Sequence, residues 1–292
     1  MRRRNLVFLF LGFLILLNIL AWTVVFELIN SQFLEVIFFD VGQGDAIFIE
    51  TPQRHQILID GGQNSKILEK LGKTMSFWDR DIDLIILTHP ESDHLAGLIE
   101  VLKKYRVENI FWTGVRRETG EYQEWLRLIK AEKSKIFIAQ SGQQIILPSS
   151  GINNSIAILY PFETLEGKEF KDINNTSIVL KLIFGKNTFL FTGDIYKKIE
   201  KELIERGLDI DSDVLKVGHH GSQASSSEEF IQKVSPEIAV ISVGKDNKYG
   251  HPHQEVLRVL EKYDIEVLRT DFDSDIKIIS DGKEIKLKSL AL

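Results

Sequence analysis

The sequence predicts an α/β fold in which two sheets carry helices on their outer faces, preceded by one membrane-spanning helix. Three observations support this prediction. Short runs of β-branched and aromatic residues alternate with segments whose apolar residues have helical spacing. A second block rich in such runs begins near residue 156, as expected for a second sheet. A long apolar segment stands apart at the N-terminus.

The N-terminal segment, residues 6–28, reads LVFLFLGFLILLNILAWTVVFEL. About 20 apolar residues in a helix span the hydrocarbon core of a bilayer. Arginines occupy positions 2–4, and basic residues beside such a helix stay on the cytoplasmic side. We therefore expect residues 1–30 to form the anchor of a single-pass cell-membrane protein, with a cytoplasmic N-terminus and an extracytoplasmic body. A cleaved signal peptide is the alternative.

The body, residues 33–292, has no break in composition and no low-complexity segment, so we expect one domain. Strands are expected at 33–39, 46–50, 56–59, 83–88, 108–112, 136–138, 144–147, 156–160, 177–184, 188–192, 214–217, 238–242, 266–268, 276–279 and 284–287. Helices are expected at 64–71, 97–105, 121–132, 196–206, 227–234 and 253–263.

The amino-acid composition excludes some kinds of site and of binding partner. The chain of 292 residues has no cysteine, which excludes a disulfide framework and a thiolate metal site. The formal net charge is −6, and the arginines at positions 2–4 belong to the anchor, so the body is more acidic still. An acidic body argues against tight, non-specific binding of a polyanion, although bound divalent cations could reverse the charge locally.

The densest group of chemically capable side chains is the stretch 88–94, THPESDH, which directly follows the apolar run 83–87. A loop anchored by a buried strand can turn several nitrogen and oxygen ligands toward one point. His89 with Glu91 and Asp93 with His94 form two such pairs. The stretch therefore predicts a metal loop that could serve two ions.

Further ligands stand at the ends of other apolar runs. Asp194 ends such a run and could bridge two ions, although for a TGD motif taken alone an ordinary helix N-cap is the better explanation. His219 and His220 end another. Adjacent histidines cannot easily bind one ion together, so we expect one to be the ligand and the other to line the site. His251 precedes Pro252 and either caps the next helix or faces the substrate.

Seven motifs, taken together and in this order, carry a resemblance to a known family. They are DVGQGDA (40–46), LIDGG (58–62), THPESDH (88–94), NNTSIVL (174–180), FTGD (191–194), LKVGHHGS (215–222) and YGHP (249–252). The set resembles the metallo-β-lactamase superfamily and, within it, the C-terminal hydrolase domain of ComEC-type DNA-uptake proteins. The resemblance runs from about residue 33 to the last strands. It implies an αββα sandwich with a metal site at one edge, between the sheets.

The resemblance also implies roles for individual residues. It assigns His89 and Glu91 to a first ion, Asp93 and His94 to a second, Asp194 to a bridging position, and His219 or His220 to the second ion. Asp60 would support the metal loop through hydrogen bonds.

Two positions depart from the superfamily pattern: Glu91 replaces the usual histidine, and the stretch at Asn174 lacks one. The first ion thus has fewer and harder ligands. We expect one or two Zn²⁺ ions, with Mn²⁺ as the alternative.

These features together predict a metal-dependent hydrolase that acts through metal-activated water. Asp93 or Asp194 could orient the water, and Lys216, Ser222 and His251 are candidate donors to the developing charge. The carboxylate-rich site and the ComEC likeness favour a phosphodiesterase, most simply a nuclease linked to DNA uptake in competence. A surface phosphoesterase of the phosphocholine-esterase type is one alternative. A non-catalytic module that receives DNA for a separate channel protein is another.

Overall fold

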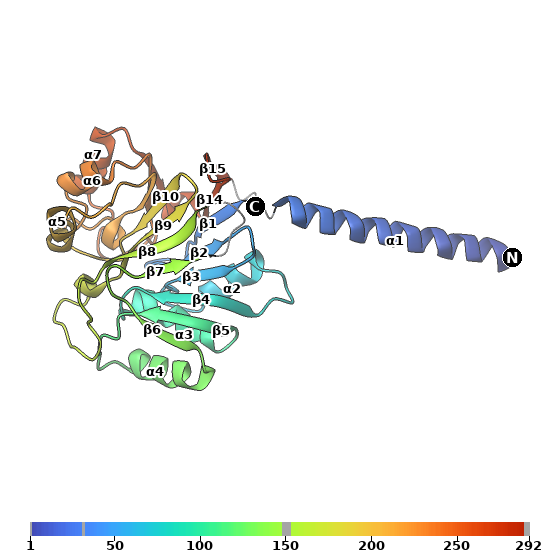
Figure 1. The fold of residues 1–292 in the computed structure, drawn as a ribbon, viewed down its shortest axis with the longest axis horizontal. Coiled ribbons are helices and arrows are strands. Elements are labelled where there is room, and N and C mark those ends of the chain that lie inside the picture. Colours follow the sequence, from blue (N-terminus) through green and yellow to red (C-terminus); the bar gives the residue numbers. More distant parts are fainter. Residues whose placement is uncertain (1, 31–32, 148–152, 289–292) are drawn as a thin grey trace.

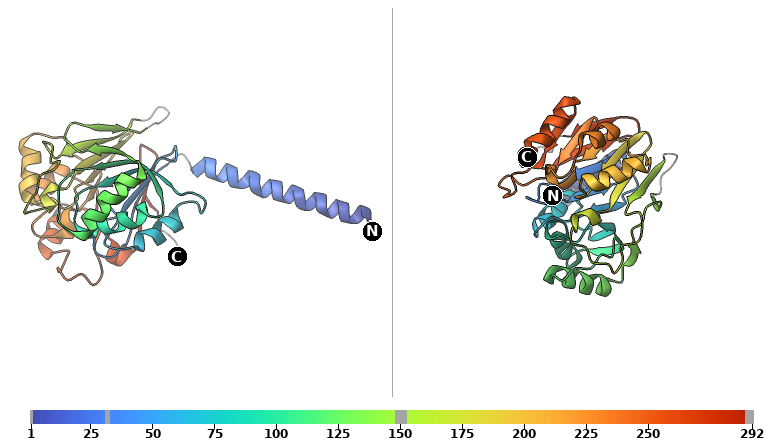
Figure 2. Two further views of the ribbon diagram at one scale, coloured as in Figure 1. Left: turned by 90° about the horizontal axis from the view of Figure 1, so that it is seen from below. Right: turned by 90° about the vertical axis from the view of Figure 1, so that its left-hand side faces the viewer.

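Two stacked sheets form the body of the protein, and helix α1 (Arg2–Asn30) projects from it (Figures 1 and 2). The computed structural model describes residues 2–30, 33–147 and 153–288. The first sheet has, in spatial order, β15 (Ile285–Lys288), β14 (Ile276–Ser280), β1 (Leu34–Phe38), β2 (Ile47–Glu50), β3 (Gln56–Ile59), β4 (Asp81–Leu87), β5 (Arg106–Trp112) and β6 (Lys135–Ile138). The second has β13 (Glu266–Arg269), β12 (Ile238–Ile241), β11 (Val214–Lys216), β10 (Asn187–Phe191), β9 (Val179–Phe184), β8 (Asn154–Tyr160) and β7 (Gln144–Ile146). Every strand expected from the sequence overlaps one of these.

Helices cover the outer face of each sheet, so the body is an αββα sandwich, as predicted. The first sheet carries α2 (Lys66–Thr74), α3 (Ser92–Leu102) and α4 (Gly120–Glu132). The second carries α5 (Lys197–Glu205), α6 (Glu228–Val234) and α7 (Gln254–Lys262). Short helices η1 (Asn174–Thr176), η2 (Gly218–Gly221) and α8 (Thr270–Asp273) join these elements.

Strand β4 shows how the sequence divides its apolar residues between the layers. Leu84 and Ile86 lie in the core between the sheets, and the alternate residues Ile85 and Leu87 lie in the core under α2, α3 and α4. Successive strand residues point to opposite faces of a sheet. Because both faces of β4 are covered, its sequence is a continuous apolar run and not an alternation of apolar and polar residues.

The strands that matter for function share one direction. In the first sheet β3, β4, β5 and β6 are parallel, and β1 points the same way because it is separated from β3 by two antiparallel pairings. In the second sheet β10, β11, β12 and β13 are parallel. Parallel strands bring the loops after their carboxyl ends to one edge, where ligands bind in open α/β sheets.

Helix α3 begins five residues earlier than the sequence suggested, at Ser92 and not at residue 97. Its first turn carries Asp93 and His94, whose polar character hid the helical spacing. His94, Leu98 and Leu102 are buried at intervals of four and lie along one side of the helix. The second half of the metal loop is therefore helical, which fixes the direction of both side chains.

Gly97 lets α3 approach the end of β3. A Cβ atom at Gly97 would lie 1.8 Å from the carbonyl oxygen of Gly61. We expect Gly97→Ala to lower the free energy of unfolding by at least about 1–3 kcal/mol, the usual effect of overpacking. In the matched variant Gly72→Ala in α2 the added methyl group meets nothing within 4 Å, so a gain of about 0.5–1 kcal/mol is expected. Urea unfolding measures both, and a Gly97→Ala protein as stable as the wild type would contradict the close packing.

Helix α1 is a candidate membrane span. Residues Arg4–Val25 have a mean hydropathy of 2.5 and no part of the segment is buried. The described buried core begins at Leu34, so α1 contributes nothing to it. We therefore expect the body from Phe33 onward to fold without α1. Helix α1 precedes β1 in the chain, and the start of β1 lies at the edge opposite to the carboxyl ends of the parallel strands.

Candidate metal centre

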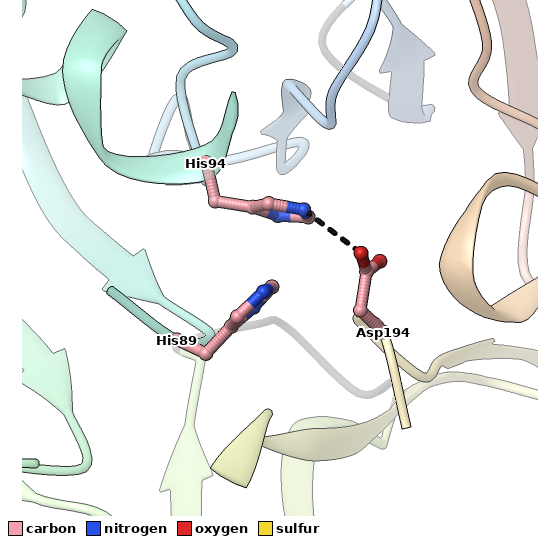
Figure 3. A group of neighbouring side chains, drawn as sticks. All are labelled: His89, His94 and Asp194. Carbon is pink, nitrogen blue, oxygen red and sulfur yellow. Dashed lines mark ion pairs between the residues drawn. The ribbon is translucent and has the colours of Figure 1, made fainter. Parts of the chain in front are cut away.

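The motif residues meet at the edge where the parallel strands end. His89 follows β4, Asp194 follows β10, and His220 lies in the short helix η2 that follows β11. Asp93 and His94 lie on the first turn of α3. Figure 3 shows His89 at the end of β4, His94 on the first turn of α3 and Asp194 after β10, with their side chains converging. Residues more than 100 positions apart in the chain thus face one another in groups that could hold a metal ion.

Three histidine rings are held through Nδ1. Nδ1 of His94 lies 2.8 Å from Oδ2 of Asp60, and Nδ1 of His220 lies 2.8 Å from the carbonyl oxygen of Ser242. Thr88 donates its hydroxyl to Asp60 at 2.6 Å, so it can accept from Nδ1 of His89 at 3.0 Å. All three Nε2 atoms are buried without a hydrogen-bond partner. Histidines that bind metals are oriented in this way, through the nitrogen that does not bind.

The distances between the converging atoms fit a bound cation better than hydrogen bonds. Nε2 of His94 and Nε2 of His220 each lie 3.4 Å from Oδ2 of Asp194, and Nε2 of His220 lies 3.4 Å from Oδ2 of Asp93. Good N–H···O hydrogen bonds are about 2.7–3.2 Å long. Ligands about 2.0–2.2 Å from a tetrahedral ion are separated by about 3.3–3.6 Å. We call Asp93, His94, His220 and Asp194 the four-ligand set.

The electrostatics of the four-ligand set also suit a cation. Burial would lower the pKa of His94 and His220, but the carboxylates around them, with Asp194 first, together outweigh it and raise the pKa of both well above the ordinary value. Burial would raise the pKa of Asp194, but His220, His94 and Lys216 hold it well below its usual range. Protons on two histidines thus balance the buried carboxylates, and a divalent cation would displace them.

Lys216 is a buried residue that contacts Asp194, a member of the four-ligand set. Its side chain is completely buried, and Nζ contacts a carboxylate oxygen of Asp45, the carbonyl oxygen of Gly193 at 3.0 Å and Oδ1 of Asp194 at 3.5 Å. An ammonium group has three donors, and these acceptors take all of them. The sequence suggested Lys216 as a donor to the substrate, but this geometry suits a residue that positions Asp194.

Fewer ligands surround the position beside His89. Burial and the charge of His94 lower the pKa of His89 to about 3, so the ring is neutral and able to bind a metal. It forms a group with His94 and Asp194. Glu91 belongs to none of the His/Asp groups among the described residues, and its carboxylate lies 2.8 Å from Nη2 of Arg117. A first ion at His89 would therefore lack the second carboxylate that the resemblance assigned to it.

His219 and His220 point in different directions. Both have a left-handed backbone, with φ of 48° and 55°, and their ring planes differ by 67°. His220 belongs to the groups that could hold a metal ion, whereas Nε2 of His219 lies 3.2 Å from Nδ2 of Asn174 and 3.9 Å from Asp194. Asn174 stands where the superfamily usually has a histidine. His219 thus lines the site from one side, and His220 faces its centre.

The comparison with known proteins agrees with this site and fold. A family model described as the metallo-beta-lactamase superfamily matches residues 39–245. The chain belongs to the metallo-β-lactamase superfamily. It is 34% identical over 260 residues to "ComE operon protein 3" of Bacillus subtilis and 30% identical over 251 residues to "Competence protein ComA" of Neisseria gonorrhoeae. Each match covers 83% of this chain but only 32% of the relative, so the chain spans about a third of these relatives' length.

A solved structure of the metallo-β-lactamase fold confirms the architecture. The protein YhfI of Bacillus subtilis superposes with a TM-score of 0.54 at 13% sequence identity, over 87% of this chain and 100% of YhfI. At this level of identity the likeness concerns the fold alone. The superfamily resemblance and the αββα sandwich expected from the sequence are thus confirmed, and the fold implies a metal-dependent hydrolase with a divalent cation.

The sequence did not single out two residues of this metallo-β-lactamase site. Asp45 is buried, contacts Lys216, and lies 3.4 Å from Nδ1 of His220 through Oδ1. Its position in the glycine-rich DVGQGDA motif was the available signal: at Gly44, with φ of +118°, a Cβ atom would lie 2.0 Å from the carbonyl oxygen of Asp93. Arg117, which follows β5, brings a positive charge to the mouth through its pair with Glu91.

His251 and Ser222 are the remaining residues that the sequence suggested as donors to the substrate. His251 is half-buried, with its ring centroid 5.4 Å from that of His219, and burial with the charges of neighbouring histidines lowers its pKa to about 4. It does not cap α7, whose N-cap is His253. Ser222 is buried, and its hydroxyl accepts from the amide of Ala224 at 3.3 Å.

Proposed function

We propose that the protein is a membrane-anchored, extracytoplasmic metal-dependent phosphodiesterase, a nuclease of the ComEC type linked to DNA uptake. The four-ligand set carries this proposal: two histidine nitrogens without hydrogen-bond partners and two carboxylates lie at the spacing of metal ligands. The set occupies the edge at which the parallel strands end, where α/β proteins bind their ligands.

The four-ligand set would hold one divalent cation. Two imidazoles with two carboxylates suit Zn²⁺, and the share of hard oxygen ligands makes Mn²⁺ the alternative. When bound, the ion supplies Lewis-acid chemistry by acidifying a water and polarising a phosphoryl oxygen. The position at His89 would hold a second ion more weakly, because Glu91 is paired with Arg117.

Other steps of the proposed reaction are assigned to side chains of the protein: orientation of the water, hydrogen bonding to the substrate and attraction of the phosphate. The side chain of Asp93 is 29% exposed and that of Asp194 only 3%, so Asp93 meets the entering water and Asp194 stays behind the ion position. Asp93 would orient the water and accept its proton. His251 is uncharged at neutral pH and would donate a hydrogen bond to a phosphoryl or leaving oxygen at the rim. Arg117 would attract the phosphate.

A phosphodiester polymer fits this site better than a choline ester. A quaternary ammonium group is held by several aromatic walls together. Trp112 is buried against Tyr122 and Trp125, and Trp78 lies before β4, at the opposite end of that strand from His89. Tyr249 lies beside the site against His251, and Tyr196 is stacked on His219, so two tyrosines border the site without a tryptophan between them. The competence proteins among the relatives favour DNA as the polymer and a separate channel protein as a partner.

The anchor sets the proposed location. Arg4–Val25 is long and apolar enough to cross a bilayer, and the arginines at positions 2–4 favour a cytoplasmic N-terminus. The body would then lie outside the cytoplasm, where incoming DNA is met.

The test uses the body from Phe33, freed of metal and supplied with Zn²⁺ or Mn²⁺. We expect metal-dependent cleavage of bis-p-nitrophenyl phosphate and of single-stranded DNA, and loss of both in the Asp93→Ala, Asp194→Ala variant. Asp81→Ala, Glu205→Ala is the matched control, because it removes the same charge from two exposed carboxylates whose partners are also exposed, and it should keep full activity. Cleavage of the small ester alone would contradict a nuclease. Stoichiometric metal binding without turnover would contradict an enzyme of this class.

A further inference from the structure

An aromatic row runs from solvent to the four-ligand set. Tyr249 is stacked on His251 with ring centroids 5.6 Å apart and planes 23° apart, and His251 meets His219 at 5.4 Å. The ring of His251 also lies 6.4 Å from that of His220, which belongs to the four-ligand set. Tyr249 itself is 66% exposed and belongs to no core cluster among the described residues, so packing does not explain its place.

The loop that presents Tyr249 is held by one side chain. The amide group of Asn247 donates to the carbonyl oxygens of Gly244 at 2.9 Å and His251 at 2.8 Å. It also accepts from the backbone N–H groups of Tyr249 at 3.2 Å and His251 at 2.9 Å. Four hydrogen bonds from one residue fix the turn. A contact residue ordered in advance loses little conformational freedom when a ligand binds.

We propose that Tyr249 is a stacking subsite for a nucleobase of a single-stranded nucleic acid whose phosphate lies at the metal centre. One face of the ring is covered by His251, and the ring's high exposure leaves the other available to a planar group. The exposed residues Lys245 and Lys248 precede Tyr249 in the same loop and suit neighbouring phosphates, with one of their two charges offset by the exposed Asp246. This inference rests on the proposed function and adds the class of group recognised beside the scissile bond.

Stacking would also compensate for the net negative charge of the body, which repels nucleic acid. The body is acidic, so phosphate contacts alone would hold a nucleic acid weakly. Base–aromatic stacking is insensitive to sequence and contributes about 5- to 100-fold in affinity per base. Tyr249 and Tyr196 are each stacked on a histidine through one ring face, so they do not form the several walls of a quaternary-ammonium cage, and a flat base is the better ligand.

The experiment compares two probes on the metal-free body, which lacks the ion that cleavage requires. One is a fluorescein-labelled dT 12-mer, and the other is a 12-mer with the same phosphates but abasic sugars. Fluorescence anisotropy should give tighter binding of the dT probe by at least about fivefold. Tyr249→Ala should abolish this preference, whereas Tyr249→Phe should keep it.

Trp78→Ala is the matched control, because Trp78 is also 66% exposed but lies at the other end of β4. It should leave the preference unchanged. A preference that survives Tyr249→Ala, or no preference in the parent protein, would overturn the stacking subsite even if phosphodiesters are cleaved. If the preference depends on Tyr249 but the wild-type body supplied with metal cleaves neither phosphodiester substrate, the subsite would be upheld and the phosphodiesterase refuted.

Discussion

Replacing Lys216 by methionine is expected to lower the free energy of unfolding of the metal-free body by about 3–5 kcal/mol, the usual loss when one partner of a buried ion pair is removed. Methionine keeps most of the length of the side chain, so little cavity is added. The change removes the ammonium group that neutralises Asp45 and Asp194, both of them buried. The two carboxylates would then keep only the charge of the neighbouring histidines, with His220 at 3.4 Å from each, in a region where water cannot compensate for the lost ammonium group.

Urea unfolding of the metal-free body measures this loss, and Lys181→Met is its matched control. Lys181 is also buried, but its partner Asp209 is 78% exposed at 2.9 Å, so that carboxylate regains water when the lysine is lost. The control should cost less than about 1 kcal/mol in electrostatic terms. Equal losses in the two variants would show that Lys216 acts through packing, and would contradict its role as the counter-charge of Asp45 and Asp194.

Loss of the His220 imidazole is expected to remove tight metal binding, whereas loss of the His219 imidazole is not. His220 directs an unpaired Nε2 at the carboxylates of Asp93 and Asp194, while Nε2 of His219 is taken by Asn174. Removing a residue that only supports a ligand weakens metal binding by about 10–100-fold, so removing a ligand should exceed that range.

Competition with a chromophoric chelator gives the Zn²⁺ Kd of the body without reference to activity. His220→Ala should bind more than about 100-fold more weakly than the wild type, and His219→Ala should stay within about threefold. The same titration counts ions, and the structure favours one tight ion per chain. Similar losses in both variants would show that His219 is a ligand too and that the first position is filled as well.

The sequence was sufficient for the sandwich and for the metal loop, because both are recorded in local patterns. Apolar runs such as 83–87 identify buried strands, and ligand-type residues directly after them identify the functional edge. The choice for Asp194 between bridging ligand and helix N-cap was open in the sequence. The structure places its side chain in the buried cluster, and α5 has Tyr196 as its N-cap.

What the sequence left open depends on long-range geometry. The difference between His219 and His220 follows from two successive left-handed residues, which no local pattern records. The pairing of Glu91 joins it to Arg117, which lies beyond a helix and a strand. The start of α3 was misplaced because its first turn faces the site and is polar, so burial there comes from the second sheet and not from apolar spacing.

The direction of the strands also determines what an anchored molecule can reach. Helix α1 joins the body where β1 begins, and the four-ligand set lies beyond the ends of β4, β10 and β11. With residues 4–25 in a bilayer, the centre would stand about 20 Å, one strand length, farther from the lipid than the tether point. Headgroup esters of the leaflet beside the tether would lie behind the body. Chains arriving through water would meet the centre first, so the tether by itself favours long soluble polymers over lipids.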